Sequence, residues 1–254
     1  MRLFRGFEEL DSIVRPVVTL GSFDGVHAGH RRILDKLKSE AERINGESVV
    51  ITFEPHPRQI IYPNESIELL TTLEEKAELL SSLGIDNLLV IKFNEQFRQL
   101  NSDEFVKDYL IGKLGIKSMI VGYNHHFGHN RSGDFNHLKP LHNELGFNLL
   151  RVDKFDNGAG KISSTEIRKL IKSGSIEQAN QLLEYQYSIS GSINHDNTFI
   201  KESPNKIIPD SGTYKTTINN SPKTVKINSQ EQIIICENTP AVETATIKFL
   251  QKII

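Results

Sequence analysis

The chain has 254 residues, a formal net charge of −2 at pH 7 and one cysteine, Cys236. The length allows one large domain or two small ones, and the near-neutral charge gives no reason to expect binding to nucleic acid. A lone cysteine excludes an internal disulfide and fits the reducing cytoplasm. The N-terminus lacks an apolar signal-peptide core, and no apolar run reaches the roughly 18 residues that a membrane span needs. We therefore expect a soluble cytoplasmic protein that contacts no membrane.

Strands and helices are predicted to alternate up to about residue 185. Apolar runs predict five strands, at 17–20, 49–53, 87–93, 118–121 and 147–152. Helical periodicity and capping signals predict helices at 29–44, 72–84 and 102–115, the last capped by Ser102, and two short helices from about 164 and 175. Repeated β-α units imply an α/β fold with a parallel sheet covered by helices on both faces, where ligands bind at the carboxyl ends of the strands.

The composition changes after residue 185, where Asn, Ser, Thr and Lys dominate. Apolar and polar residues alternate at 214–218, 225–227 and 245–249, which predicts antiparallel strands, with a turn at 219–222. We therefore divide the chain into a domain at 1–185 and a small, mostly antiparallel β domain at 186–254.

The loop after the first strand carries the strongest functional signal. An apolar strand leads into Gly-Ser-Phe-Asp-Gly-Val-His-Ala-Gly-His at 21–30, and a helix follows at once. His27 and His30 are thereby placed at the positive end of a helix, beside backbone N–H groups without intrahelical partners, which suits a nucleoside triphosphate. Asp24 is suited to orienting a histidine or fixing the loop. Three glycines let the phosphates approach the backbone closely: Gly21, Gly25 and Gly29.

A second stretch with phosphate-binding character occupies 161–168. Ser163 and Glu166 satisfy the capping box of a helix. Hydroxyl groups and the guanidinium of Arg168 at a helix N-terminus also form a clamp for phosphate. A nucleotidyl transfer requires such groups, because the protein must align two reactants and stabilise charge on the phosphates.

These two stretches resemble the signatures of the nucleotidyltransferase superfamily. Two segments between them, Thr-Phe-Glu-Pro-His-Pro at 52–57 and Val-Gly-Tyr-Asn-His-His-Phe-Gly at 121–128, narrow the match. They are similar to the FMN adenylyltransferase module of the prokaryotic bifunctional riboflavin kinase/FAD synthetases, over roughly residues 1–190. The resemblance implies a Rossmann-like domain that transfers the adenylyl group of ATP to FMN, releasing FAD and pyrophosphate, with Mg²⁺ bound to ATP.

The same resemblance implies a role for individual residues. The catalytic residues would be His27, His30 and Arg168. ATP would contact Gly21, Ser22, Phe23, Asp24, Gly25, Gly29, Ser163, Ser164 and Thr165. The flavin would contact Phe53, Pro55, His56, Asn124 and Phe127. Two positions depart from the common pattern, since many members have Asn in place of Ser22 and Asp in place of Asn124.

A histidine-rich segment at 125–129 is open to two interpretations. His125, His126 and His129 lack a cysteine or acidic partner at ligand spacing. We therefore predict a substrate-binding loop and no protein metal site.

The C-terminal domain departs further from the family pattern. A riboflavin kinase β-barrel, which usually carries Gly-Phe-Pro-Thr-Ala-Asn, follows the first module in the family. Segments 187–193 and 206–214 resemble its strands, but 195–203 stands in place of the motif, and Gly-Phe-Pro-Thr occurs nowhere in the chain. We expect a truncated barrel without kinase activity, and FMN supplied by a separate riboflavin kinase.

Three alternatives remain open at this point. The chain could be a complete bifunctional enzyme with an unfamiliar kinase site. It could be a nucleotidyltransferase acting on pantetheine phosphate, nicotinate mononucleotide or an alditol phosphate. It could also be a noncatalytic flavin- or nucleotide-binding protein descended from the enzyme.

Overall fold

The computed structural model describes residues 1–123, 125–129, 132–153 and 162–253. Asn124, one of the predicted flavin contacts, lies outside the described residues. The described residues form two compact units. The first contains residues from 1–23, 29–66 and 73–153, and the second contains 24–28, 67–72 and 162–253. Each unit is described by itself below.

The first unit is built on a six-stranded parallel sheet. Its strands are β1 (Arg2–Phe4), β2 (Val17–Leu20), β3 (Ser48–Glu54), β4 (Asn87–Lys92), β5 (Ser118–Gly122) and β6 (Asn148–Val152), in the order β1-β4-β3-β2-β5-β6. All four residues of β2 are buried, as in a central strand covered on both faces. The chain adds β3 and β4 on one side of β2 and β5 and β6 on the other, so the strand order reverses at β2. Parallel sheets bind ligands outside the carboxyl ends of the strands at such a reversal.

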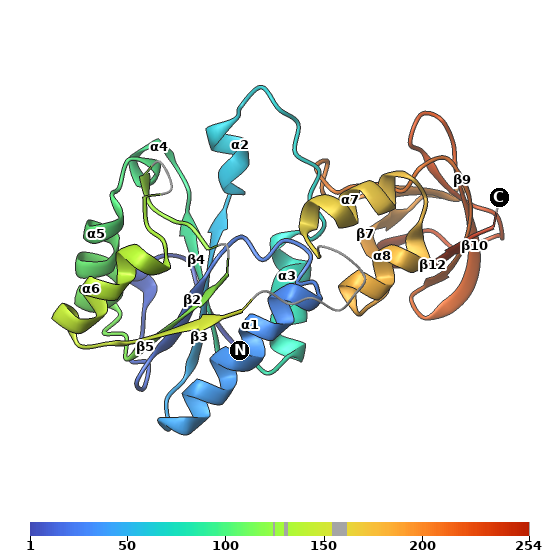
Figure 1. Ribbon diagram of the computed structural model, residues 1–254. Coiled ribbons are helices and arrows are strands. Elements are labelled where there is room, and N and C mark those ends of the chain that lie inside the picture. The colour runs from blue at the N-terminus through green and yellow to red at the C-terminus, as the bar shows by residue number, and fades with distance from the viewer. Residues whose placement is uncertain (124, 130–131, 154–161, 254) are drawn as a thin grey trace. The chain divides into compact units, whose positions relative to one another are not determined.

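Helices lie on both faces of the sheet (Figure 1). The helices of this unit are η1 (Phe7–Glu9), α1 (Ala28–Arg43), α2 (Pro57–Ile61), α3 (Leu73–Ser82), α4 (Glu95–Arg98), α5 (Ser102–Glu104), η2 (Phe105–Lys113) and α6 (Phe135–Leu145). The helix α1 buries Leu34, Leu37 and Ala41, as its periodicity predicts. The π-helix η2 continues α5 and joins one core cluster with alternate residues of the strands, among them Val18 and Met119. The predicted parallel sheet with helices on both faces is therefore confirmed.

The structure corrects the start of one predicted helix. Asn101 is the N-cap of α5, because its side chain accepts a hydrogen bond from the N–H of Glu104 at 2.8 Å. Ser102 is the first helical residue and is buried. Both residue types are good caps, so sequence alone does not decide between neighbours.

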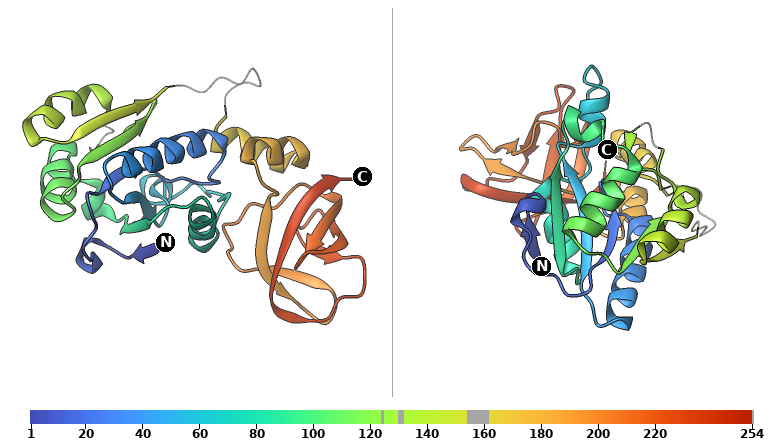
Figure 2. Two further views of the ribbon diagram at one scale, coloured as in Figure 1. Left: turned by 90° about the horizontal axis from the view of Figure 1, so that it is seen from below. Right: turned by 90° about the vertical axis from the view of Figure 1, so that its left-hand side faces the viewer.

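The second unit combines two helices with a closed antiparallel barrel. The helices are α7 (Ser164–Lys172) and α8 (Ile176–Leu183). The strands are β7 (Ser188–Ile193), β8 (Thr198–Lys201), β9 (Gly212–Ile218), β10 (Ser221–Ile227), β11 (Ile233–Ile235) and β12 (Val242–Lys252), and they close in the order β10-β11-β8-β7-β12-β9 (orange to red in Figure 2). The barrel confirms the expected antiparallel β domain.

Alternation of apolar and polar residues explains how the barrel encloses its core. Ile189, Ile247 and Phe249 point inward and are fully buried, in one cluster with residues of α7 and α8. Asn219 and Asn220 join β9 to β10 with φ of 49° and 67°, as a two-residue hairpin turn requires. Among the residues that the structure describes, no helix has both the length and the apolar character to cross a membrane.

Candidate active site

The loop that follows β2 has a strained backbone. Phe23 and Val26 have φ of 46° and 37°, a left-handed conformation that a β-branched residue rarely adopts. Gly25 has a φ of 84°, and a Cβ atom there would lie 2.7 Å from the Cδ1 atom of Leu70. A side chain at this position would therefore be strained, which favours glycine. Backbone strain of this kind persists where the surrounding structure fixes it, as it commonly does at functional loops.

The two histidines of the loop lie on either side of the start of α1. His27 directly precedes the helix and is 5% exposed. Its pKa is lowered to about 4, chiefly by burial and to a lesser extent by Arg168, while a backbone hydrogen bond and Asp24 oppose the shift. The imidazole is therefore neutral at pH 7. His30 lies in the first turn of α1, with its ring centroid 5.1 Å from that of Phe23, and Gly29 lies between the two histidines.

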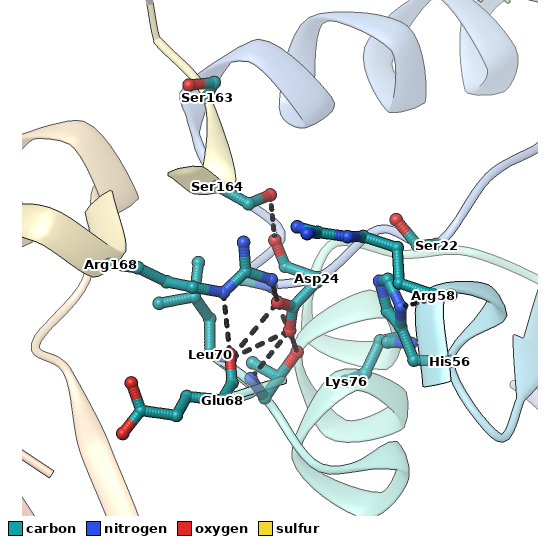
Figure 3. A network of polar contacts seen from close by, with 12 residues as sticks. Ser22, Asp24, His56, Arg58, Glu68, Leu70, Lys76, Ser163, Ser164 and Arg168 are labelled. Carbon is teal, nitrogen blue, oxygen red and sulfur yellow. Dashed lines mark hydrogen bonds and ion pairs between the residues drawn. The ribbon is translucent and has the colours of Figure 1, made fainter. Parts of the chain in front are cut away.

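Asp24 is the centre of a polar network in the second unit (Figure 3). Its carboxylate is 1% exposed and accepts hydrogen bonds from the backbone N–H groups of Leu70 and Thr71, each at 3.0 Å. It also forms an ion pair with Arg168. A buried carboxylate is costly unless it is paired and hydrogen-bonded, and Asp24 has both kinds of partner.

Arg168 is held by two of its N–H groups. One Nη donates to the carboxylate of Asp24, and Nε donates to the backbone carbonyl of Glu68 at 2.6 Å (Figure 3). A guanidinium has five N–H donors. An arginine fixed by two of them keeps a defined orientation and retains donors that suit a phosphate.

One of the predicted hydroxyl groups at the N-terminus of α7 joins this network. Ser164 Oγ donates to the backbone carbonyl of Asp24 at 2.9 Å. Ser163 is the N-cap of α7 and accepts from the N–H of Glu166 at 3.3 Å. Thr165 is exposed in the first turn. The structure thus brings Asp24, Ser164 and Arg168 into direct contact across widely separated positions of the chain.

The first unit contains a separate, largely apolar cavity of about 570 Å³. It opens beside the carboxyl ends of β2 and β3, where residues from both strand-end loops contribute to its wall. Its lining is Leu20, Gly21, Ser22, Phe53, His56, Pro57, Arg58, Ile61, Tyr62, Phe93, Phe97, Arg98, Leu100, Phe105, His125, His126, Phe127, Gly128 and His129. A cavity of this size and polarity is typical of a small-molecule site.

Aromatic side chains form a continuous wall of this cavity. The ring of Phe97 lies 5.8 Å from that of Phe53, 5.9 Å from that of Phe93 and 5.7 Å from that of Phe105, measured between centroids. Phe105 continues the series to Phe127 at 6.1 Å. Such a wall offers π-faces and edges to a planar ring system.

The predicted flavin residues fall into two groups. Phe53, His56 and Phe127 line the cavity, whereas Pro55 is not among its lining residues. The Nδ1 atom of His56 accepts a hydrogen bond from the backbone N–H of Arg58 at 3.2 Å and so caps α2.

Sequence reasoning missed much of the lining. Phe93, Phe97 and Phe105 were absent from the predicted set, as were the two arginines of the cavity, Arg58 and Arg98. The one signal available in the sequence was the density of phenylalanines just after a predicted strand. Residues that fill a hydrophobic core give the same pattern. All three histidines of the 125–129 segment line the cavity, as a substrate-binding loop would.

The described residues contain no group of three or more His, Cys, Asp and Glu side chains arranged to hold a metal ion. Asp24 is occupied by Arg168 and backbone donors.

The sequence also matches a family model described as FAD synthetase, over residues 11–166. That match covers more than half of the chain. It includes the loop after β2, the segments 52–57 and 121–128, and the start of α7. The chain belongs to the FAD synthetase family.

Individual relatives support the same assignment. The chain is 38% identical over 200 residues to the bifunctional riboflavin kinase/FMN adenylyltransferase of Buchnera aphidicola subsp. Schizaphis graminum, covering 78% of the chain and 64% of the relative. It is 34% identical over 197 residues to the protein of the same name from Escherichia coli K12, covering 77% and 63%. The aligned part therefore spans less than two thirds of each of these relatives.

A solved structure matches the fold of nearly the whole chain. The crystal structure titled macrolide-efflux protein from Streptococcus pneumoniae superposes with a TM-score of 0.85, covering 99% of this chain and 90% of that one. The sequence identity is 22%, so this likeness concerns the fold alone.

Proposed function

We propose that the protein transfers the adenylyl group of ATP to FMN, giving FAD and pyrophosphate, and that it does so in the cytoplasm. Membership of the FAD synthetase family over residues 11–166 carries this proposal. Two features of the structure support it. The aromatic cavity suits a planar isoalloxazine ring, and the network of Asp24, Ser164 and Arg168 suits a triphosphate.

The proposed reaction needs alignment and charge stabilisation more than covalent chemistry. An oxygen of the FMN phosphate attacks the α-phosphorus of ATP, and a new P–O bond forms. The bond from the α-phosphorus to the oxygen shared with the β-phosphate breaks, and its electron pair leaves with pyrophosphate. The protein's part is to hold the two phosphates in line and to place donors where charge develops.

The histidines and the arginine would then have different electrostatic roles. His27 is neutral at pH 7 because its burial lowers its pKa to about 4, so it would donate a hydrogen bond to a phosphate oxygen without carrying charge. His30, in the first turn of α1, would lie at the positive end of the helix dipole. Arg168 would supply the positive charge, already oriented by Asp24 and Glu68.

Other predicted contacts would serve binding. The loop glycines Gly21, Gly25 and Gly29 would admit the triphosphate, and Ser22 and Phe23 would border it. Ser163, Ser164 and Thr165 would bind its phosphate oxygens at the start of α7. Phe53, Pro55, His56 and Phe127 would surround the flavin, together with Asn124.

Mg²⁺ would arrive with ATP. The donor set of the described residues fits this, because it has no carboxylate cluster that would hold the ion by itself. Mg²⁺ commonly binds through substrate phosphates and water and neutralises phosphate charge.

We further propose that residues 1–185 form the adenylyltransferase domain and that 186–254 form a riboflavin-kinase-like domain without kinase activity. The absence of a Gly-Phe-Pro-Thr sequence from the chain supports the second assignment. FMN would then come from a separate riboflavin kinase.

One chromatographic assay tests these proposals together. The purified protein is incubated with Mg²⁺ and ATP, with FMN in one tube and riboflavin in another, and the flavins are resolved. We expect FAD from FMN and no product from riboflavin. FMN or FAD formed from riboflavin would overturn the loss of kinase activity. If no FAD forms in the FMN tube while the protein still binds flavin, the proposed enzymatic function is wrong and the protein is a noncatalytic flavin-binding protein.

A further inference from the structure

The segment Ile67–Thr72, here called the bridging segment, supplies the backbone donors that bind the Asp24 carboxylate. The backbone N–H groups of Leu70 and Thr71 donate to its carboxylate, each at 3.0 Å. The hydroxyl of Thr71 accepts from the N–H of Gly25 at 3.0 Å. The position of the Asp24 carboxylate therefore depends on where the bridging segment lies.

The opposite side of the bridging segment is bound to the segment that leads into β9. The N–H of Leu69 donates to the carbonyl of Asn205 at 2.7 Å. The Nζ atom of Lys206 donates to the carbonyl of Leu70 at 2.6 Å. The peptide groups of Leu70 thus link Lys206 on one side to Asp24 on the other.

Lys206 is fixed from several directions. It is 2% exposed, and a buried ammonium group is costly unless its donors are satisfied. Its Nζ lies 4.8 Å from the ring centroid of Tyr187, whose hydroxyl donates to the carbonyl of Ile207 at 2.6 Å. Lys201 donates to the carbonyls of Pro204 and Lys206, at 2.8 and 3.0 Å. The lysine therefore has little freedom to release the bridging segment.

We propose that Lys206 is a positioning residue for adenylyl transfer, acting through Leu70 to hold Asp24 and, through Asp24, Arg168. The inference rests on the proposed function, because it takes Arg168 to bind the triphosphate. It gives the C-terminal domain a part in adenylyl transfer that is independent of kinase chemistry. A displacement of about 1 Å at a catalytic group can cost as much as 100-fold in rate.

The main test compares Lys206→Met with a matched control. Thr216→Val also removes a buried donor from the barrel, since Thr216 is 2% exposed and its hydroxyl donates to the carbonyl of Lys223 at 2.8 Å. We expect Lys206→Met to lower kcat/KM for ATP by about 10- to 100-fold. KM for FMN should change less than about twofold, because none of the cavity residues belongs to the second unit. Thr216→Val should leave both parameters near those of the wild type.

A second measurement tests the mechanism without using activity. Hydrogen–deuterium exchange at the amides of Leu70 and Thr71 reports whether these groups still donate to Asp24. Exchange should accelerate at least tenfold in Lys206→Met and not in Thr216→Val. If Lys206→Met does not fold, Lys201→Met is the substitute, because half-buried Lys201 donates to the carbonyls of Pro204 and Lys206 and so helps to hold Lys206 in place. The same acceleration of exchange at Leu70 and Thr71 is expected in that variant.

The outcomes separate this inference from the proposed function. An inactive wild type would overturn the proposed function. An active wild type whose Lys206→Met variant keeps the wild-type KM for ATP, kcat and amide protection would overturn the inference alone. An equal loss of activity in Thr216→Val would also overturn it, because general destabilisation of the barrel would then suffice.

Discussion

On the proposed function, the polar network around Asp24 and the aromatic cavity of the first unit would solve two different recognition problems. The network consists of buried charge, backbone amides and hydroxyls, each with a defined partner. The cavity is walled largely by rings that stand 5.6–6.1 Å apart, and their contacts are less directional than hydrogen bonds. A phosphate group needs fixed donors, whereas a flat heteroaromatic ring needs area. The first kind of site should therefore fail abruptly on substitution and the second gradually.

The largest effect is expected at the two loop histidines. The double variant His27→Ala, His30→Ala should lower kcat for FAD formation by at least 100-fold, because each positioned electrostatic group is typically worth ~10²–10³-fold. FMN binding, followed by quenching of flavin fluorescence, should be unchanged. His195→Ala, which replaces an exposed histidine, is the control and should be fully active. If the double variant turns over at nearly the wild-type rate, His27 and His30 have no catalytic role.

Asp24→Asn should produce the next largest effect. It removes the charge opposite Arg168 in a buried ion pair, which typically costs about 3 kcal/mol or more in the free energy of unfolding. Asp210→Asn is a matched control, because Asp210 is exposed and its partner, the Nζ of Lys252, lies 3.4 Å away. The control should cost at most about 1 kcal/mol. Urea unfolding curves measure both, and equal losses would contradict the central role of Asp24.

Phe97→Leu should have a moderate effect that is confined to the flavin. Replacing one stacking ring is expected to weaken FMN binding by about tenfold, since stacking on an aromatic side chain is worth about 1–3 kcal/mol. KM for ATP should stay the same. Phe147→Leu serves as the control, because Phe147 is buried in the same core cluster and does not line the cavity. If both variants weaken FMN binding equally, the loss comes from disturbed core packing and not from the cavity wall.

The smallest expected effect is on the pH dependence of stability. The pKa of His27 is lowered to about 4 in the folded protein, chiefly by burial, against about 6.5 for an exposed histidine. Between these values the unfolded chain binds the proton more readily, so stability is fully present above pH 6.5 and falls as the pH drops towards 4. Between pH 7 and 5.5 the loss from His27 is about 1 kcal/mol.

His27→Gln is the variant that isolates this contribution. It should reduce the fall in Tm between pH 7 and 5.5 by about 2–4 °C. Part of the fall should remain, because burial also lowers the pKa of His125 to about 4. An unchanged fall in Tm would show that His27 does not titrate as its burial indicates.

The fold could be predicted from the sequence wherever an element produced a long pattern of apolar residues within one continuous segment. All five predicted strands of the sheet are present as β2 to β6, because buried parallel strands read as apolar runs. The strand β1 was missed, since its three residues pair with β4, far along the chain. The helix α6 was also missed, because Pro140 interrupts its pattern.

The contacts within the candidate site could be predicted where the proposed chemistry calls for polar residues at fixed spacing. Asp24, Ser164 and Arg168 were identified from two motifs and lie in direct contact. Phe97 and Phe105 could not be identified, because a ring that lines a cavity and a ring that fills a core have the same sequence pattern. The link from Lys206 to Leu70 was also invisible, since it depends on tertiary contacts between segments without motifs.

The strand β12 pairs along one edge with β7 and along the other with β9, and so it closes the barrel. Loss of its eleven residues, by proteolysis or a premature stop, would leave two adjacent strands with unpaired N–H and C=O groups. Such edges readily recruit strands from other molecules. A small deletion at this end of the chain should therefore be seen first as aggregation, before any change in catalysis could be measured.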